Sequence, residues 1–180
     1  MATAGKSHNY FELFGLPESY DLDLAELSKR YRKLQKAVHP DRFASASDLE
    51  RRLSVQQSAL INEAYQTLKS PLRRAQYMLQ LKGVDLSNDI SARMDPEFLM
   101  QQMHLREELE QVRQSADPVS KLMTLSAEIA QGIAEQDGIL NQLFTEASPD
   151  KLGQIADFVR RMQFMLKLQQ EIEALEEELI

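Results

Sequence analysis

The tripeptide His39-Pro40-Asp41 lies between two stretches with helical periodicity, Asp23–Val38 and Asp48–Lys69. Proline disfavours helical backbone in the residue before it and has no N–H of its own to donate, so the first helix ends at the tripeptide. Connections between helices in compact domains are usually short, and a short link makes two helices antiparallel neighbours. The sequence therefore predicts a helical hairpin that presents the tripeptide at its tip.

The first helix of this hairpin has two different faces. Its apolar residues recur at three- and four-residue spacing, the pattern of a helix packed on one side: Leu24, Leu27, Tyr31, Leu34 and Val38. At about 100° per residue, the opposite face carries the cations Lys29, Arg32, Lys33 and Lys36. A solvated surface is the simplest interpretation, because charged side chains are normally exposed. Since this basic face leads into the protruding tripeptide, its position favours a binding surface.

Capping signals mark the other helices of the first half. A capping residue is followed three positions later by glutamate at three sites: Asn9 with Glu12, Asp23 with Glu26, and Ser47 with Glu50. The helix after Ser47 is predicted to bury the stripe Leu53, Leu60, Ala64 and Leu68. Ser70-Pro71 ends that helix and starts a fourth, which Gly83 terminates.

Three helix starts of one type follow in the second half: Asp95-Pro96, Asp117-Pro118 and Ser148-Pro149. A capping residue followed by proline is a strong start signal, and it predicts helices over about 96–115, 118–146 and 149–179. Short turns between them favour an antiparallel three-helix bundle. With no alternating Val/Ile/Thr-rich run, the predicted fold class is all-α. We expect an N-terminal hairpin domain with short flanking helices at 8–83, a linker at 84–94 and the bundle at 95–180.

The helix after Asp95 carries one apolar stripe more than a small bundle needs. Phe98, Leu105, Leu109 and Val112 form the core stripe, and well off it lie Leu99, Met100 and Met103, with His104, Glu107 and Gln111 close by. An exposed apolar patch often marks a partner site, and Met adapts its shape to a binding surface. Packing against the first domain is the alternative, and periodicity does not decide between the two.

The last helix changes its apolar face along its length. The stripe Leu152, Ile155, Val159, Met162 and Leu166 gives way to Phe164, Leu168, Ile172, Leu175 and Leu179. Either this helix packs on both sides, or Phe164 joins the exposed patch.

Composition narrows the possible functions. The net charge of −7 is uneven: residues 1–83 hold 13 Lys and Arg against 9 Asp and Glu, whereas residues 84–180 hold 8 against 19. The acidic half argues against a nucleic-acid binder. With no Cys and only three His, we expect no disulfide, no metal site and no cofactor. No apolar run approaches the roughly 20 residues that span a bilayer. The first ten residues lack the long apolar stretch of a secretory signal, so we expect a cytoplasmic protein without a membrane partner.

The first 83 residues resemble a J-domain. The likeness rests on the short helix from Tyr10-Phe11 to Leu16, the basic helix, His39-Pro40-Asp41-Arg42, and the run Ile61-Asn62-Glu63-Ala64-Tyr65-Gln66-Thr67-Leu68. J-domains stimulate ATP hydrolysis by a DnaK-type chaperone and dock through the tripeptide and the basic helix. The resemblance implies that role for His39, Pro40, Asp41, Lys29, Arg32, Lys33 and Lys36. Arg42 stands where many J-domains have Lys, and it keeps the charge.

The likeness extends to the HscB family of iron–sulfur-cluster co-chaperones. The segments that are similar to this family are Tyr10–Pro17, His39–Ala44, Phe98-Leu99-Met100 and Leu105-Arg106-Glu107-Glu108-Leu109. In that family an acidic three-helix bundle binds the cluster scaffold protein IscU and delivers it to the chaperone HscA. The matching scaffold-binding positions are Leu99, Met100, Met103, His104, Glu107, Gln111 and Phe164, which include the spare face found by periodicity. His104 and Gln111 depart from the family, where acidic residues are common.

Three functions compete on these grounds. The leading hypothesis is a non-enzymatic adaptor that binds HscA at one end and IscU at the other. A J-domain protein with a different client is the second. The third is an enzyme that uses His39 and Asp41 as an acid–base pair, which no accompanying nucleophile, metal cluster or phosphate loop supports. A purely structural helical protein would leave the protruding tripeptide without a role.

Overall fold

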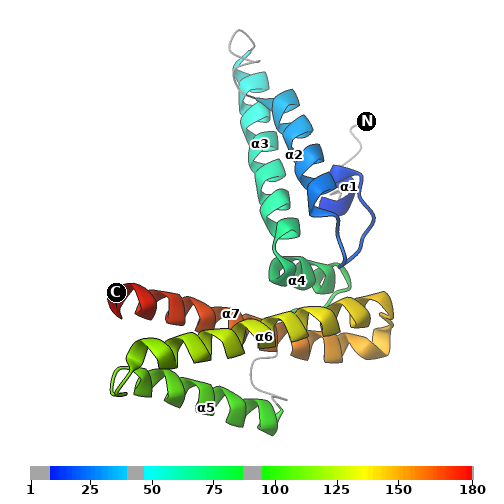
Figure 1. The fold of residues 1–180 in the computed structure, drawn as a ribbon. Helices are drawn as coiled ribbons and strands as arrows, with labels where there is room; N and C mark the ends of the chain where they lie inside the picture. The colour runs from blue at the N-terminus through cyan, green and yellow to red at the C-terminus, as the bar shows by residue number, and fades with distance from the viewer. Residues whose placement is uncertain (1–8, 40–46, 87–94, 180) are drawn as a thin grey trace. The chain divides into compact units, whose positions relative to one another are not determined.

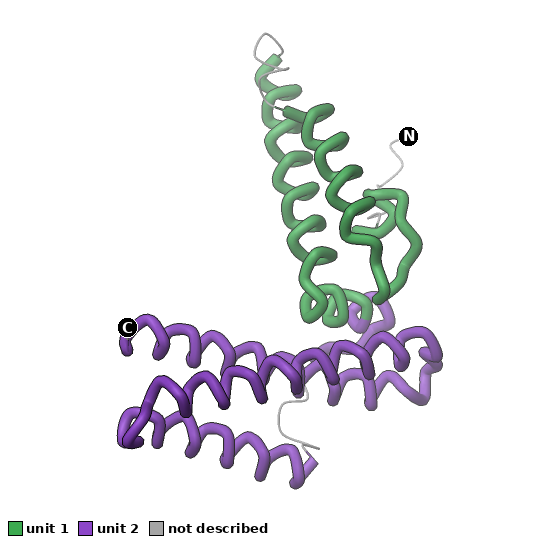
Figure 2. Tube along the Cα trace, in the orientation of Figure 1, with its two compact units in different colours: residues 1–78 green, residues 79–180 purple. Residues whose placement is uncertain are grey.

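The computed structural model describes residues 9–39, 47–86 and 95–179, and the regular elements within these ranges are all helical (Figure 1). The chain divides into two compact units between Met78 and Leu79 (Figure 2). This division falls inside one helix, a few residues before the expected boundary at residue 83. None of the helices in the described ranges is long and apolar enough to cross a bilayer.

The first unit is built on the predicted hairpin. Its helices are α1 (Tyr10–Phe14), α2 (Leu24–Val38), α3 (Asp48–Lys69) and the larger part of α4 (Pro71–Leu81). Figure 1 shows α2 and α3 side by side and antiparallel, as predicted. Pro40 and Asp41 lie outside the described residues, so His39 is the described member of the tripeptide.

The caps predicted for residues 9–83 are confirmed. The Asn9 side chain accepts a hydrogen bond of 2.8 Å from the Glu12 N–H. Asp23 accepts from two N–H groups at the start of α2, and Ser47 and Glu50 form a reciprocal capping box. Gly83 has a φ of 79°, the left-handed conformation of a helix C-terminus. Local sequence therefore sets where these helices begin and end.

The apolar stripes of the hairpin are predicted less well. Leu24, Leu53 and Leu60 are exposed by 43%, 46% and 45% respectively, so their assignment to the core is wrong. The core side of α3 consists of Ser54, Ile61, Ala64 and Leu68. Ser54 and Ile61 each follow a predicted leucine by one residue, which turns the packed face by about 100°. Serine replaces an apolar residue here because its hydroxyl donates a 2.6 Å hydrogen bond to the Val38 carbonyl.

The second unit contains the predicted bundle. Its helices are α5 (Pro96–Val112), α6 (Pro118–Thr145) and α7 (Leu152–Leu179), and η2 (Pro149–Lys151) is a turn of 3₁₀-helix before α7. Asp95 and Asp117 cap α5 and α6 as predicted. Ser148 makes no side-chain cap hydrogen bond, and the α-helix after it starts three residues later than expected.

The core of the bundle follows the predicted stripes. On α5, Phe98, Leu105 and Val112 are buried, and Leu109 packs against the core cluster that contains Leu105 and Val112. On α7, the buried set passes from Ile155, Val159 and Met162 to Leu168, Ile172 and Leu175. The change of apolar face along α7 is therefore real, and the second stripe joins Leu105 and Leu122 in one core cluster.

Candidate partner-binding sites

Five of the residues expected to bind a chaperone surround one open groove on the first unit. Eight of the described residues line it: Lys29, Tyr31, Arg32, Lys33, Gln35, Lys36, His39 and Asn62. Four of them are Lys or Arg, and none is acidic. The groove would therefore attract a negatively charged partner.

His39 forms the end of α2 beside this groove. Its backbone is extended, with φ −60° and ψ 129°, as expected for a residue that precedes proline. Its side chain is exposed. The helix therefore presents an accessible imidazole at the end of the basic groove.

The basic face stays exposed even where it pairs within the chain. Lys29 Nζ lies 3.3 Å from a Glu26 carboxylate oxygen, yet the Lys29 side chain is 75% exposed. A side-chain hydrogen bond from Arg30, followed by one from Lys29, lowers the pKa of Glu26 below its ordinary value. Arg32 and Lys33 are exposed. Charge on the groove remains accessible to a partner.

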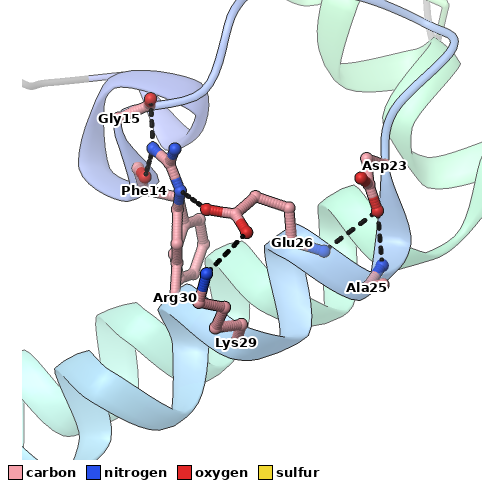
Figure 3. A network of polar contacts seen from close by, with 7 residues as sticks. All are labelled: Phe14, Gly15, Asp23, Ala25, Glu26, Lys29 and Arg30. Atoms are coloured by element: carbon pink, nitrogen blue, oxygen red, sulfur yellow. Dashed lines mark hydrogen bonds and ion pairs between the residues drawn. The ribbon is translucent and has the colours of Figure 1, made fainter.

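Arg30 has a different role from the neighbouring cations (Figure 3). Its guanidinium donates 2.8 Å hydrogen bonds to the Phe14 carbonyl and to Glu26, and a further one to the Gly15 carbonyl. These carbonyls close α1, where Gly15 has a φ of 63°. Arg30 thus ties the end of α1 to α2.

The groove also contains polar residues that the sequence analysis did not assign to it. The Tyr31 hydroxyl donates to Asn62 Oδ1 at 2.7 Å, and Gln35 Nε2 donates to the same oxygen at 2.6 Å. Gln35 carries no charge and belongs to no apolar stripe, so neither pattern marked it. The available signal was spacing: Tyr31, Gln35 and His39 recur every four residues and share one side of α2.

A second candidate site lies on the outer side of α5. Leu99, Met100 and Met103 are exposed by 40%, 65% and 64%, while the neighbouring Phe98 and Leu105 are buried. The other three predicted α5 positions, His104, Glu107 and Gln111, are also exposed. The predicted spare face of α5 is therefore an apolar strip with a polar border on the surface of the second unit.

Phe164 lies at the seam between α5 and α7. It is half-buried, and its ring meets the ring of Phe98 edge-on at a centroid distance of 5.8 Å. The guanidinium of Arg106 lies 5.7 Å from the centroid of the same ring and pairs with Glu171 at 3.5 Å. Phe164 therefore packs into the bundle against Phe98, the residue before Leu99, and stays partly accessible.

Clusters of metal-ligating side chains are absent from the described residues. No three His, Cys, Asp or Glu side chains within them lie close enough together to hold an ion. His104 Nε2 instead lies 3.7 Å from Glu108, one helical turn away. The two candidate sites are surfaces suited to binding other macromolecules.

The two units match two family models. Residues 9–77 match the DnaJ domain, and residues 94–173 match the "HSCB C-terminal oligomerisation domain". The co-chaperone protein HscB homologue of Shewanella pealeana is 48% identical to this chain, covering 96% of the chain and 99% of the relative. The corresponding homologue of Vibrio cholerae is 46% identical, with the same two coverages.

Solved structures agree with these matches. The chaperone HscB from Vibrio cholerae superimposes with a TM-score of 0.85 at 43% identity, covering 96% of this chain and all of that one. The human co-chaperone protein HscB gives a TM-score of 0.87 at 26% identity, covering 98% of this chain and 86% of the human one. The chain belongs to the HscB family of J-domain co-chaperones.

Proposed function

We propose that this chain stimulates ATP hydrolysis by the DnaK-type chaperone HscA and delivers the scaffold protein IscU to it, which assists iron–sulfur cluster assembly and transfer. One observation carries the proposal: a basic groove beside His39 on one unit and an exposed apolar strip on α5 of the other. A chain with two such surfaces can bind two partners at once.

The chaperone end is the basic groove with His39, Pro40 and Asp41. J-domain family membership implies an Hsp70-type partner. Lys29, Arg32, Lys33 and Lys36 would steer an acidic chaperone surface toward the groove, and such long-range attraction raises association rates. His39 at the end of α2 would then meet the bound chaperone first.

The client end is the α5 strip with Phe164. Leu99, Met100 and Met103 offer adaptable apolar contacts, and exposed apolar area of this kind marks partner sites. Glu107 adds a carboxylate to the border of the strip, whereas His104 and Gln111 are not acidic. We therefore expect binding to the scaffold to depend mainly on apolar contact and only weakly on salt.

The benefit of joining the two ends follows from mass action. Once the scaffold is bound to one unit, its effective concentration near a chaperone held by the other unit is set by the connection between the units. No contact between chaperone and scaffold needs to pre-exist. This is a binding function, in agreement with relatives that are named co-chaperones.

The departures at His104 and Gln111 favour one alternative, a J-domain co-chaperone for a different client. The steady-state ATPase rate of HscA separates the two when measured with this protein, with IscU, and with both. Stimulation by both that far exceeds either alone supports the proposal. Stimulation that IscU leaves unchanged favours the alternative, and no stimulation by this protein contradicts its role as a J-domain co-chaperone.

A further inference from the structure

The two halves of the α2–α3 hairpin are held together differently. Near α1 the hairpin buries Leu27, Ile61 and Leu68, each at most 4% exposed, and Ser28 shares a single hydrogen bond with the Tyr65 hydroxyl. Toward the tip, serines take over the core side of α3, because Ser54 and Ser58 both bond to residues of α2. In the described tip half, hydrogen bonds therefore join α2 and α3 beside the half-buried Leu34 and Val38.

Gln35 is the centre of these bonds. Its Nε2 donates to Asn62 Oδ1 at 2.6 Å and to the Ser58 carbonyl at 3.3 Å. Its Oε1 accepts from the Ser58 hydroxyl at 3.1 Å. The Tyr31 hydroxyl adds a second donor to Asn62 Oδ1. Both ends of the Gln35 amide are thus anchored on α3.

This network lies one helical turn from the tip of the hairpin, so it can fix the position of His39. Gln35 precedes His39 by one helical turn, and both line the groove together with Asn62. The hydrophobic effect is non-directional, whereas a hydrogen bond weakens steeply when its angle or length changes. The network therefore fixes the rotation and axial position of the last turn of α2 against α3.

We infer that Gln35, Ser58 and Asn62 form a positioning network that sets where His39 stands relative to the basic groove, and so controls how well a docked chaperone is activated. The inference rests on the proposed function. Asn62 is its most testable member, because it is exposed on α3, lies on the groove, and contributes its oxygen as the shared acceptor.

Two substitutions separate positioning from charge. Asn62→Ala removes the acceptor, whereas Asn62→Asp keeps an oxygen for both donors and adds a negative charge to a groove lined by four cations. Gln56→Ala is the control, because Gln56 is exposed on α3 and does not line the groove. All variants are first checked for wild-type helical content by circular dichroism.

The readout is the ATPase rate of HscA titrated with each variant. We expect Asn62→Ala to lower the maximal stimulation by about tenfold, because misplacing a positioned group by about 1 Å can cost up to about 100-fold. Asn62→Asp should keep the maximal stimulation and raise the concentration of the variant that gives half-maximal stimulation. The inference would be overturned if Asn62→Ala gave wild-type maximal stimulation. It would also be overturned if Asn62→Ala and Asn62→Asp lost maximal stimulation equally.

A second readout does not need the chaperone. The NMR signal of the His39 imidazole, assigned by its loss in His39→Gln, should shift in Asn62→Ala and keep its position in Gln56→Ala. An unchanged His39 signal in Asn62→Ala would overturn the positioning role. Failure of the proposed function looks different, since the wild-type protein itself would then leave the ATPase rate unchanged.

Discussion

The ring of Phe164 on α7 stands edge-on to the ring of Phe98 on α5, with centroids 5.8 Å apart and planes at 90°. Phe98 is buried, whereas its neighbour Leu99 is exposed by 40%. Phe164 therefore contacts a core residue of the bundle that directly precedes Leu99, the first residue of the strip proposed to bind the scaffold. A residue in this position should serve stability and binding together.

Phe164→Ala should therefore lower both the stability of the protein and its affinity for the scaffold. Loss of a half-buried aromatic pair should lower the free energy of unfolding by about 1–3 kcal/mol. Scaffold affinity should fall as well, because part of the ring is accessible. Urea unfolding and calorimetric titration with IscU measure the two effects. Unchanged affinity would remove Phe164 from the proposed site and leave it a core residue.

Substitutions in the exposed strip on α5 should weaken scaffold binding and leave stability nearly unchanged. The double variant Leu99→Ala with Met103→Ala should weaken scaffold binding by about tenfold or more, as expected for apolar hot spots. Exposed substitutions usually change stability by no more than about 0.5 kcal/mol each, so unfolding should hardly change. Met123→Ala is a matched control, because Met123 is 65% exposed on α6. Equal scaffold binding by the double variant and the control would contradict the client site.

His39→Gln should separate folding from chaperone activation. His39 is exposed at the end of α2, outside the core. We expect wild-type circular dichroism and melting behaviour, no stimulation of the HscA ATPase rate, and unchanged affinity for IscU. Loss of helical signal would show that His39 contributes to the fold and would undermine its role as a contact.

The cations of the groove should contribute more to affinity for HscA than to the maximal ATPase rate of HscA. Arg32→Ala with Lys33→Ala removes two exposed charges that line the groove. The concentration for half-maximal stimulation should rise, and its dependence on salt should become weaker, because fewer charges remain to be screened. A salt titration of the ATPase assay measures this. A salt dependence equal to that of the wild type would exclude these two residues from the docking surface.

The Glu26–Arg30 pair predicts a dependence of stability on pH. Hydrogen bonds from Arg30 and then Lys29 hold the pKa of Glu26 below its ordinary value of 4.5. A carboxyl with a lowered folded-state pKa stabilises the protein above its unfolded-state pKa, and this contribution is lost as the pH falls through the folded-state value. Glu26→Gln should therefore be less stable than the wild type at neutral pH.

That difference should shrink in acid. Urea unfolding of the wild type and of Glu26→Gln, compared at neutral pH and from about pH 5 down to pH 3, measures it. A stability difference that stays constant over the whole range would show that the Glu26 charge does not stabilise the fold.

Local signals in the sequence predicted the helices well. Asn9, Asp23, Ser47, Asp95 and Asp117 all cap the helices expected of them. A cap depends on residues two or three positions away, so it can be read from a short segment. The same holds for the two faces of α5, because the helical period alone separates Phe98 from Leu99.

Contacts between distant segments were predicted less well. Leu53 was expected in the core, but Ser54 packs against α2 because its hydroxyl finds the Val38 carbonyl 16 residues away. The bonds of Tyr31 and Gln35 to Asn62 span 31 and 27 residues. Such pairs depend on how two helices are rotated against each other. Hydrophobic spacing predicts this rotation only to within about one residue, or 100°.

The measurement that tests the central claim most directly is a mixing experiment with the HscA ATPase. His39→Gln keeps the client site, and the Leu99→Ala with Met103→Ala variant keeps the chaperone site. If both sites must lie on one chain, an equimolar mixture of the two variants with IscU should fail to restore the joint stimulation given by the wild type. Full stimulation by the mixture would contradict delivery by a single bivalent chain.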